Sequence, residues 1–276
     1  MQIKTFEELK KIIIDVKEPY YFRGYQNDEE LISSLGRKLN KGDYDGFSAF
    51  KEFAIDLDNQ GYQAHNFGYM ISLAQHYGIP TNLVDLTDDP LVALYFGMGG
   101  ESNKRRKFNI LFVKKNEFEN SHGNRVQIRK NILGDMMEYG LTLGDDKGLT
   151  IGQTFEFGPD TLMNKDFLQS KKFECDYRKF FTVQKDFSFI PHEENDIIRL
   201  KKQRGLFLMA ADAKKPIPKE WFSILEVDLS QNEVDILCNY LKQKNYNAKM
   251  LLPEMDITNK INIKETADKI KHKYET

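Results

Sequence analysis

Residues 73–97 read LAQHYGIPTNLVDLTDDPLVALYFG, and this stretch decides more of the fold than any other part of the chain. The apolar spacing before it predicts a helix over residues 67–77, which a glycine and a proline then end. Residues 81–87 are typical of a short strand, bounded by turn residues on both sides. Asp89 is a candidate N-cap for the next helix, with Pro90 at the first helical position. The stretch therefore predicts helix, strand and helix joined by tight turns.

The same stretch is rich in polar side chains at the ends of its predicted elements. We expect side chains at strand ends and helix starts to reach a common ligand, and a helix N-terminus adds N–H groups that favour an anion. A purely structural reading is also open, in which His76 complements the dipole of its helix and Asp89 only caps. The candidate ligand-facing residues are His76, Thr81, Asp85, Thr87, Asp88 and Tyr95.

Outward from this centre, the pattern alternates between helices and strands. No repeat or linker divides the 276 residues, so we expect one domain with an α+β fold, in which helices flank a central, bent, mixed or antiparallel sheet. Residues 114–190 have the weakest pattern and are interpreted as a variable insert. The other expected elements are helices from Thr5, over 45–60 and over 263–274, strands over 19–25, 109–113 and 221–229, a strand–turn–strand around Arg204 and Gly205, and a helix opened by a Ser230–Glu233 capping box.

Composition excludes several classes of protein. The chain has 40 basic and 42 acidic residues and a net charge of -2, which gives no global reason to expect nucleic acid or an anionic membrane as a partner. No window approaches the roughly 20 apolar residues that span a bilayer. Cys175 and Cys238 form no CxxC motif, and the five histidines show no metal spacing, so we expect a cytoplasmic protein without a metal.

Arg23 stands at the end of an aromatic strand, in the stretch PYYFRGY that begins at Pro19. An arginine at a buried strand end usually has a carboxylate partner, and Asp85 is the candidate. An arginine also binds phosphate through its planar, permanently charged fork. The sequence leaves open whether Arg23 binds a ligand or only Asp85.

Five stretches together resemble the FRG domain family, named for a Phe-Arg-Gly motif. The central stretch follows the family pattern AQHYGxPTRLLDWTxxPxxALYFA, with Asn82 in place of the usual arginine and Leu86 in place of the usual tryptophan. The resemblance runs from Tyr20 to about Asp256, apart from the weakly patterned middle. The stretches are YYFRGYQND, LISSLGR, residues 73–97, RLKKQRGLF and KMLLPEMD.

The resemblance implies a bacterial or phage protein, and the motif order is similar to that of divergent ADP-ribosyltransferases from toxin or defence systems. By that likeness NAD is the expected small-molecule nucleotide, and the acceptor, protein or nucleic acid, is open. Arg23, Gly24, His76 and Tyr95 would bind the NAD. Thr87, Gln203 and Asp85 would be catalytic, with Asp85, Asp88 or another acid supplying the carboxylate that a glutamine lacks.

Two other functions fit the same residues. The first is a non-catalytic module that binds a nucleotide or a protein, with the Arg23–Asp85 pair serving the structure. The second is a hydrolase in which His76 and Asp85 act on a phosphodiester or on NAD.

Overall fold

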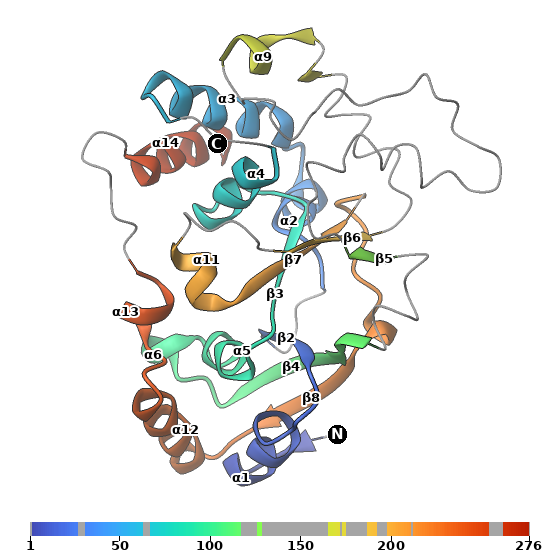
Figure 1. The fold of residues 1–276 in the computed structure, drawn as a ribbon, viewed down its shortest axis with the longest axis vertical. Coiled ribbons are helices and arrows are strands. Elements are labelled where there is room, and N and C mark those ends of the chain that lie inside the picture. The colour runs from blue at the N-terminus through green and yellow to red at the C-terminus, as the bar shows by residue number, and fades with distance from the viewer. Residues whose placement is uncertain are drawn as a thin grey trace, which may run out of the picture.

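The computed structural model describes residues 2–26, 31–62, 67–116, 126–128, 165–171, 173–174, 187–191, 198–210, 212–253 and 262–275. Most of the predicted insert, residues 114–190, lies outside the described residues. Within the described ones the predicted α+β fold is confirmed, because helices flank one open, mixed sheet (Figure 1).

The strands follow the order β1-β8-β4-β2-β3-β7-β6-β5 across the sheet. The β1–β8 and β5–β6 pairs are parallel, and the other neighbours are antiparallel. Figure 1 shows the bend: β3 runs at a wide angle to β4 and β8. The strands are β1 Gln2–Ile3, β2 Tyr20–Tyr25, β3 Leu83–Thr87, β4 Lys107–Lys114, β5 Val126–Ile128, β6 Phe187–Pro191, β7 Gly205–Ala210 and β8 Ser223–Asp228.

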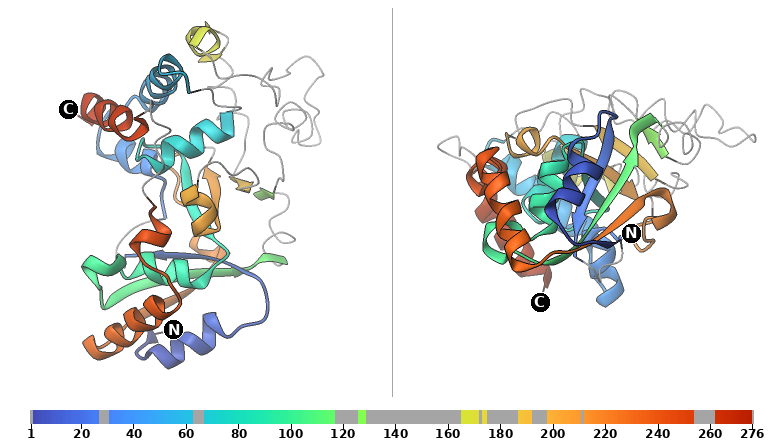
Figure 2. Two further views of the ribbon diagram at one scale, coloured as in Figure 1. Left: turned by 60° about the vertical axis from the view of Figure 1, so that its left-hand side comes forward. Right: turned by 90° about the horizontal axis from the view of Figure 1, so that it is seen from below.

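Helices pack against both ends of the bent sheet (Figure 2). One apolar core joins α3, α4, α9 and α14 to Leu83 and Phe207 of the sheet. A second core joins α1, α5 and α12 to the β1, β2, β4 and β8 strands. The helices and helical turns are α1 Phe6–Leu9, η1 Lys10–Ile14, α2 Ser34–Lys41, α3 Gly46–Asn59, α4 Phe67–His76, α5 Pro90–Gly97, α6 Gly100–Asn103, α9 Lys165–Gln169, α11 Ile198–Gln203, η2 Lys219–Trp221, α12 Gln231–Gln243, α13 Ala248–Leu251 and α14 Ile263–Glu275.

Local signals place the central elements as predicted. Asp89 caps α5 by accepting a hydrogen bond from the Leu91 amide, and Pro90 is its first helical residue. Thr5 forms the predicted capping box at the start of α1. Because Asp89 lies only two residues after the end of β3, the cap fixes how α5 leaves the sheet.

Two local predictions are corrected. The segment before Arg204 is the α11 helix and not a strand, because Arg204 has a φ of 46° and turns the chain from α11 directly into β7. Ser230 caps α12, as expected, but Glu233 does not close a capping box. Its Oε2 instead accepts a 2.7 Å hydrogen bond from the Phe6 amide, so this carboxylate joins α12 to α1.

None of the helices in the described ranges has both the length and the apolar character needed to cross a membrane.

Candidate functional site

The sheet opens between β2 and β3. β2 pairs with β4 along its whole length, from Tyr20 opposite Lys114 to Tyr25 opposite Asn109. With β3 it pairs only where Phe22 lies opposite Thr87. Beyond that point the backbone of β3 has no β2 partner, and side chains supply the hydrogen bonds.

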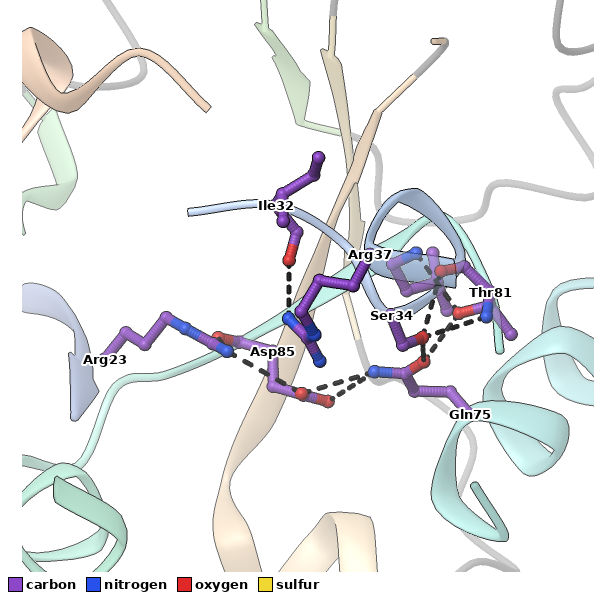
Figure 3. Close-up of polar contacts among 8 residues, drawn as sticks. Arg23, Ile32, Ser34, Arg37, Gln75, Thr81 and Asp85 are labelled. Atoms are coloured by element: carbon purple, nitrogen blue, oxygen red, sulfur yellow. Dashed lines mark hydrogen bonds and ion pairs between the residues drawn. The ribbon is translucent and has the colours of Figure 1, made fainter. Parts of the chain in front are cut away.

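Arg23 bridges this opening. Its Nη1 donates a 2.6 Å hydrogen bond to the Asp85 carbonyl oxygen and lies 3.6 Å from the carboxylate Oδ2 of the same residue. Figure 3 shows Gln75 approaching the Asp85 carboxylate from the other side, through Nε2 at 3.4 Å from Oδ1 and 3.3 Å from Oδ2. The carboxylate is therefore held between a strand and a helix that are far apart in sequence.

A pocket of about 310 Å³ lies over this opening, with walls from β2, α4, β3, α5, α11 and β7. This volume is at the lower end of the range for small-molecule sites. The Asp85 side chain is 54% exposed and the Arg23 side chain 20%, so the pair stands in an accessible site and not in a closed core. The polar lining residues are Arg23, Gln75, His76, Asp85, Thr87, Arg199 and Gln203, and the aromatic ones are Phe22, Phe96 and Phe207.

Six of the seven predicted site residues line this one pocket, so the structure brings together residues that are up to 180 positions apart in sequence (23 to 203). Their catalytic and binding roles stay predictions. The six are Arg23, Gly24, His76, Asp85, Thr87 and Gln203.

Tyr95 is the exception, because it does not line this pocket. Its ring is 3% exposed and packs in the core that contains α12. Burial raises the pKa of its phenol, and the nearby Glu101 raises it further. The next residue, Phe96, lines the pocket instead and is 36% exposed.

Thr87 and Gln203 use their polar groups within the protein. The Thr87 hydroxyl donates to the Gln203 carbonyl at 2.8 Å and accepts from the Asp89 amide at 3.0 Å. The Gln203 Nε2 donates to the Leu251 carbonyl at 2.8 Å, which ties α11 to α13. These contacts connect the end of β3, α5 and α11 around the pocket.

Gly24 has a structural requirement that the motif alone does not reveal. A Cβ at this position would lie 1.9 Å from the Ala93 carbonyl oxygen and 2.6 Å from the Gly97 nitrogen. Glycine is therefore needed because the α5 backbone lies directly on β2.

Asp88, the alternative catalytic acid, is engaged outside this pocket. Its Oδ1 lies 2.7 Å from Arg204 Nε and its Oδ2 lies 2.8 Å from Lys115 Nζ. Among the described lining residues Asp85 is the acid. The carboxylate of the candidate site is thus Asp85 and not Asp88.

Sequence reasoning missed Arg199, Gln75 and Phe96. Arg199 lies on α11, where its Nη1 donates to the His76 carbonyl at 3.4 Å. Burial lowers the pKa of its guanidinium, whereas the Asp85 charge acts in the opposite direction. Arg199 and Gln75 both lie in stretches that resemble the FRG family. Their closeness in sequence to Gln203 and His76 is the signal that could have identified them.

His76 contributes its backbone and its ring to different contacts. Its carbonyl accepts the Arg199 hydrogen bond, and its ring meets the edge of Phe207 at a centroid distance of 6.1 Å. The predicted hydrolase pair of His76 and Asp85 stays a prediction. Within the described ranges no three His, Cys, Asp or Glu side chains gather into a metal-binding group.

Comparison with known families gives one match. The FRG domain model matches residues 18–106. No curated protein and no solved structure matches the chain significantly. The matched segment contains the pocket residues from Phe22 to Phe96, whereas Arg199 to Phe207 lie beyond it. The chain therefore contains an FRG domain, and that domain supplies the Arg23–Asp85 pair of the candidate site.

Proposed function

We propose that the pocket binds a phosphate-bearing nucleotide of the NAD type, and that the protein is an ADP-ribosyltransferase-like enzyme or an NAD glycohydrolase. One observation carries the proposal: among the described lining residues, two guanidinium groups, Arg23 and Arg199, stand against one carboxylate, that of Asp85, so positive charge is in excess. This balance favours an anionic ligand, since an arginine fork pairs with phosphate oxygens.

The arrangement suits cleavage of the bond between nicotinamide and ribose. The bonding electron pair leaves with nicotinamide, which becomes neutral, and positive charge develops on the ribose carbon. A carboxylate near that carbon would stabilise the charge, and Asp85 is the lining carboxylate, held beside Arg23 and Gln75. Water or an acceptor hydroxyl then forms the new bond and loses its proton.

The exposed face of Phe96 offers an apolar surface for a flat ring. Phe96 takes the place that the sequence assigned to Tyr95. Arg199 is suited to hold the diphosphate, because among the described residues its guanidinium donates one long hydrogen bond, to the His76 carbonyl.

A second function, nucleotide binding without turnover, has its own support. The hydroxyl of Thr87 and the amide of Gln203 are both committed to protein partners, so neither is poised for the ribose. Arg23 also gives its Nη1 to the Asp85 carbonyl, which supports a structural role. In this function the pocket holds the ligand and nothing reacts.

Incubation with NAD and measurement of released nicotinamide by mass spectrometry separates the two functions. We expect release by the wild-type protein and a loss of about a hundredfold in Asp85→Asn, since that change removes the charge but keeps the shape. Asp235→Asn is the matched control, because Asp235 is 51% exposed, also forms an ion pair and lies outside the pocket.

Each other outcome has a clear meaning. A thermal shift with NAD but no release supports the binding module. Neither shift nor release, with ATP and ADP-ribose also inactive, contradicts both functions. Protein and nucleic-acid acceptors added to the same reaction test a role in a toxin or defence system, which is part of the proposal.

A further inference from the structure

We infer that Gln75 is a positioning residue: it holds the Asp85 carboxylate in the pocket, and Thr81 sets the orientation of the Gln75 amide. The inference deepens the proposed function and rests on it in one respect, that Asp85 is the carboxylate beside the ligand. The positioning itself is a property of the protein without any ligand.

The Asp85 carboxylate needs an external restraint. More than half of its side chain is exposed, and an exposed carboxylate on a strand rotates freely unless partners hold it. Arg23 approaches one carboxylate oxygen from β2, and Gln75 approaches both oxygens from α4 (Figure 3). Of these two partners, Gln75 is the one whose amide reaches both carboxylate oxygens.

The direction of the Gln75 amide follows from the hydrogen bonds at its other end. The Thr81 hydroxyl oxygen accepts from the Leu83 amide at 3.1 Å, so its single proton is donated elsewhere. It goes to Gln75 Oε1, at 2.6 Å. With Oε1 fixed as the acceptor, Nε2 must face Asp85, where it donates.

Thr81 is itself held in place by the start of α2. Its side chain is buried, its amide donates to Ser34 Oγ at 3.0 Å, and its carbonyl accepts from the Leu35 amide at 2.9 Å. Ser34 Oγ also lies 3.3 Å from Gln75 Oε1. The same Oγ lies 3.1 Å from the Thr81 carbonyl oxygen and has one proton to donate, so the Thr81 hydroxyl is the donor that keeps the amide oxygen turned away from the pocket.

Selective labelling of glutamine with ¹⁵N tests the positioning directly, because the side-chain NH₂ of Gln75 gives its own signal. Gln75→Met identifies that signal by its absence. We expect Thr81→Val and Asp85→Asn each to move it, and Thr81→Ser to leave it near its wild-type position. Thr266→Val is the matched control, since Thr266 Oγ1 accepts from Gln60 Nε2 at 2.7 Å and lies outside the pocket.

In the control the Gln60 signal should move and the Gln75 signal should not. An unchanged Gln75 signal in both Thr81→Val and Asp85→Asn overturns the inference, whatever the protein does with NAD. Melting temperatures of all variants confirm that folded proteins are compared.

Kinetic measurements on the same variants test whether the position of the Asp85 carboxylate affects the rate of nicotinamide release. We expect Gln75→Met and Thr81→Val to lower the kcat of nicotinamide release about tenfold or more while the Kd for NAD changes little, because a displaced carboxylate loses its alignment. Thr81→Ser should recover most of the rate. A selective rise of the Kd with an unchanged kcat overturns the positioning role, since it would make Gln75 a ligand contact. Absence of release by the wild type counts against the proposed function alone, and the NMR result then decides the positioning.

Discussion

The two edges of β2 behave differently. On the β4 side the backbones pair residue by residue along the strand, whereas on the β3 side one pair remains and Arg23 reaches across the opening. On one side main-chain hydrogen bonds set the geometry, and on the other a charged side chain replaces them. The comparison teaches that the Phe-Arg-Gly motif has three tasks on one strand: Phe22 enters the core, Arg23 spans the opening, and Gly24 admits a helix.

The largest effect should come from Gly24→Ala, which breaks the contact between β2 and α5. The added Cβ would meet the Ala93 carbonyl and the Gly97 nitrogen, both backbone atoms that cannot move aside. We expect a loss of about 3 kcal/mol or more in the free energy of unfolding, measured in urea.

Gly42→Ala is the matched control. A Cβ at Gly42 has no atom within 4 Å, and its φ of 168° is extended backbone. We expect its unfolding free energy to stay within about 1 kcal/mol of the wild type. Equal effects of the two substitutions would contradict the close approach of α5.

Next in size is Arg23→Ala, which probes the open edge itself. The Asp85 carbonyl loses a charged donor at 2.6 Å, so we expect a cost of about 1.5–3 kcal/mol in unfolding free energy. Arg106→Ala is the control, because Arg106 Nε also donates to a carbonyl, that of Leu229, but the residue is exposed and outside the pocket. A loss in Arg23→Ala no larger than in Arg106→Ala would show that the opening does not depend on this arginine.

The smallest effect should come from Tyr246→Phe, which removes a hydroxyl that follows α12 and contacts the N-cap of α5. The Tyr246 hydroxyl donates to Asp89 Oδ2 at 2.6 Å, and we expect its removal to cost about 1 kcal/mol at pH 7. Burial and then the Asp89 carboxylate raise the pKa of Tyr246 above that of a free tyrosine.

This raised pKa gives the prediction a direction with pH. An unfolded tyrosine ionises at a pKa of about 10, whereas folded Tyr246 keeps its proton to higher pH, so its contribution is complete below pH 10 and declines above it. The stability difference between wild type and Tyr246→Phe should therefore narrow from pH 8 to pH 11. A constant difference in urea unfolding across that range would contradict the hydrogen bond to a carboxylate.

Local chemistry made the central elements predictable from sequence. Asp89 and Pro90 mark the start of α5, and the aromatic run of β2 is typical of a strand. Arg23 and Asp85 were a predicted pair because an arginine at a buried strand end needs an anion. Such signals depend on a few neighbouring residues or on opposite charges, so they can be recognised before the fold is known.

Other features depend on tertiary packing. Five of the six side chains from Leu91 to Phe96 are buried, so α5 has no apolar stripe that identifies its core-facing side. The sequence therefore does not show that Tyr95 packs in the core whereas Phe96 lines the pocket. The segment IRLKKQ before Arg204 suits a strand or a helix, and the structure forms α11 there, ended by the left-handed conformation of Arg204. Arg199 reaches the pocket only because that segment is helical.

Calorimetric titration of NAD into the wild type and Arg199→Ala tests most directly whether the opening beside β2 is a ligand site. Among the described residues the Arg199 guanidinium donates one long hydrogen bond, to the His76 carbonyl, so we expect the variant to unfold at nearly the wild-type urea concentration. We predict saturable binding to the wild type and a Kd weaker by about tenfold or more in Arg199→Ala, the loss of one charge-assisted contact. Absence of binding to the wild type, or an equal Kd for both proteins, would contradict the assignment of this pocket to a nucleotide.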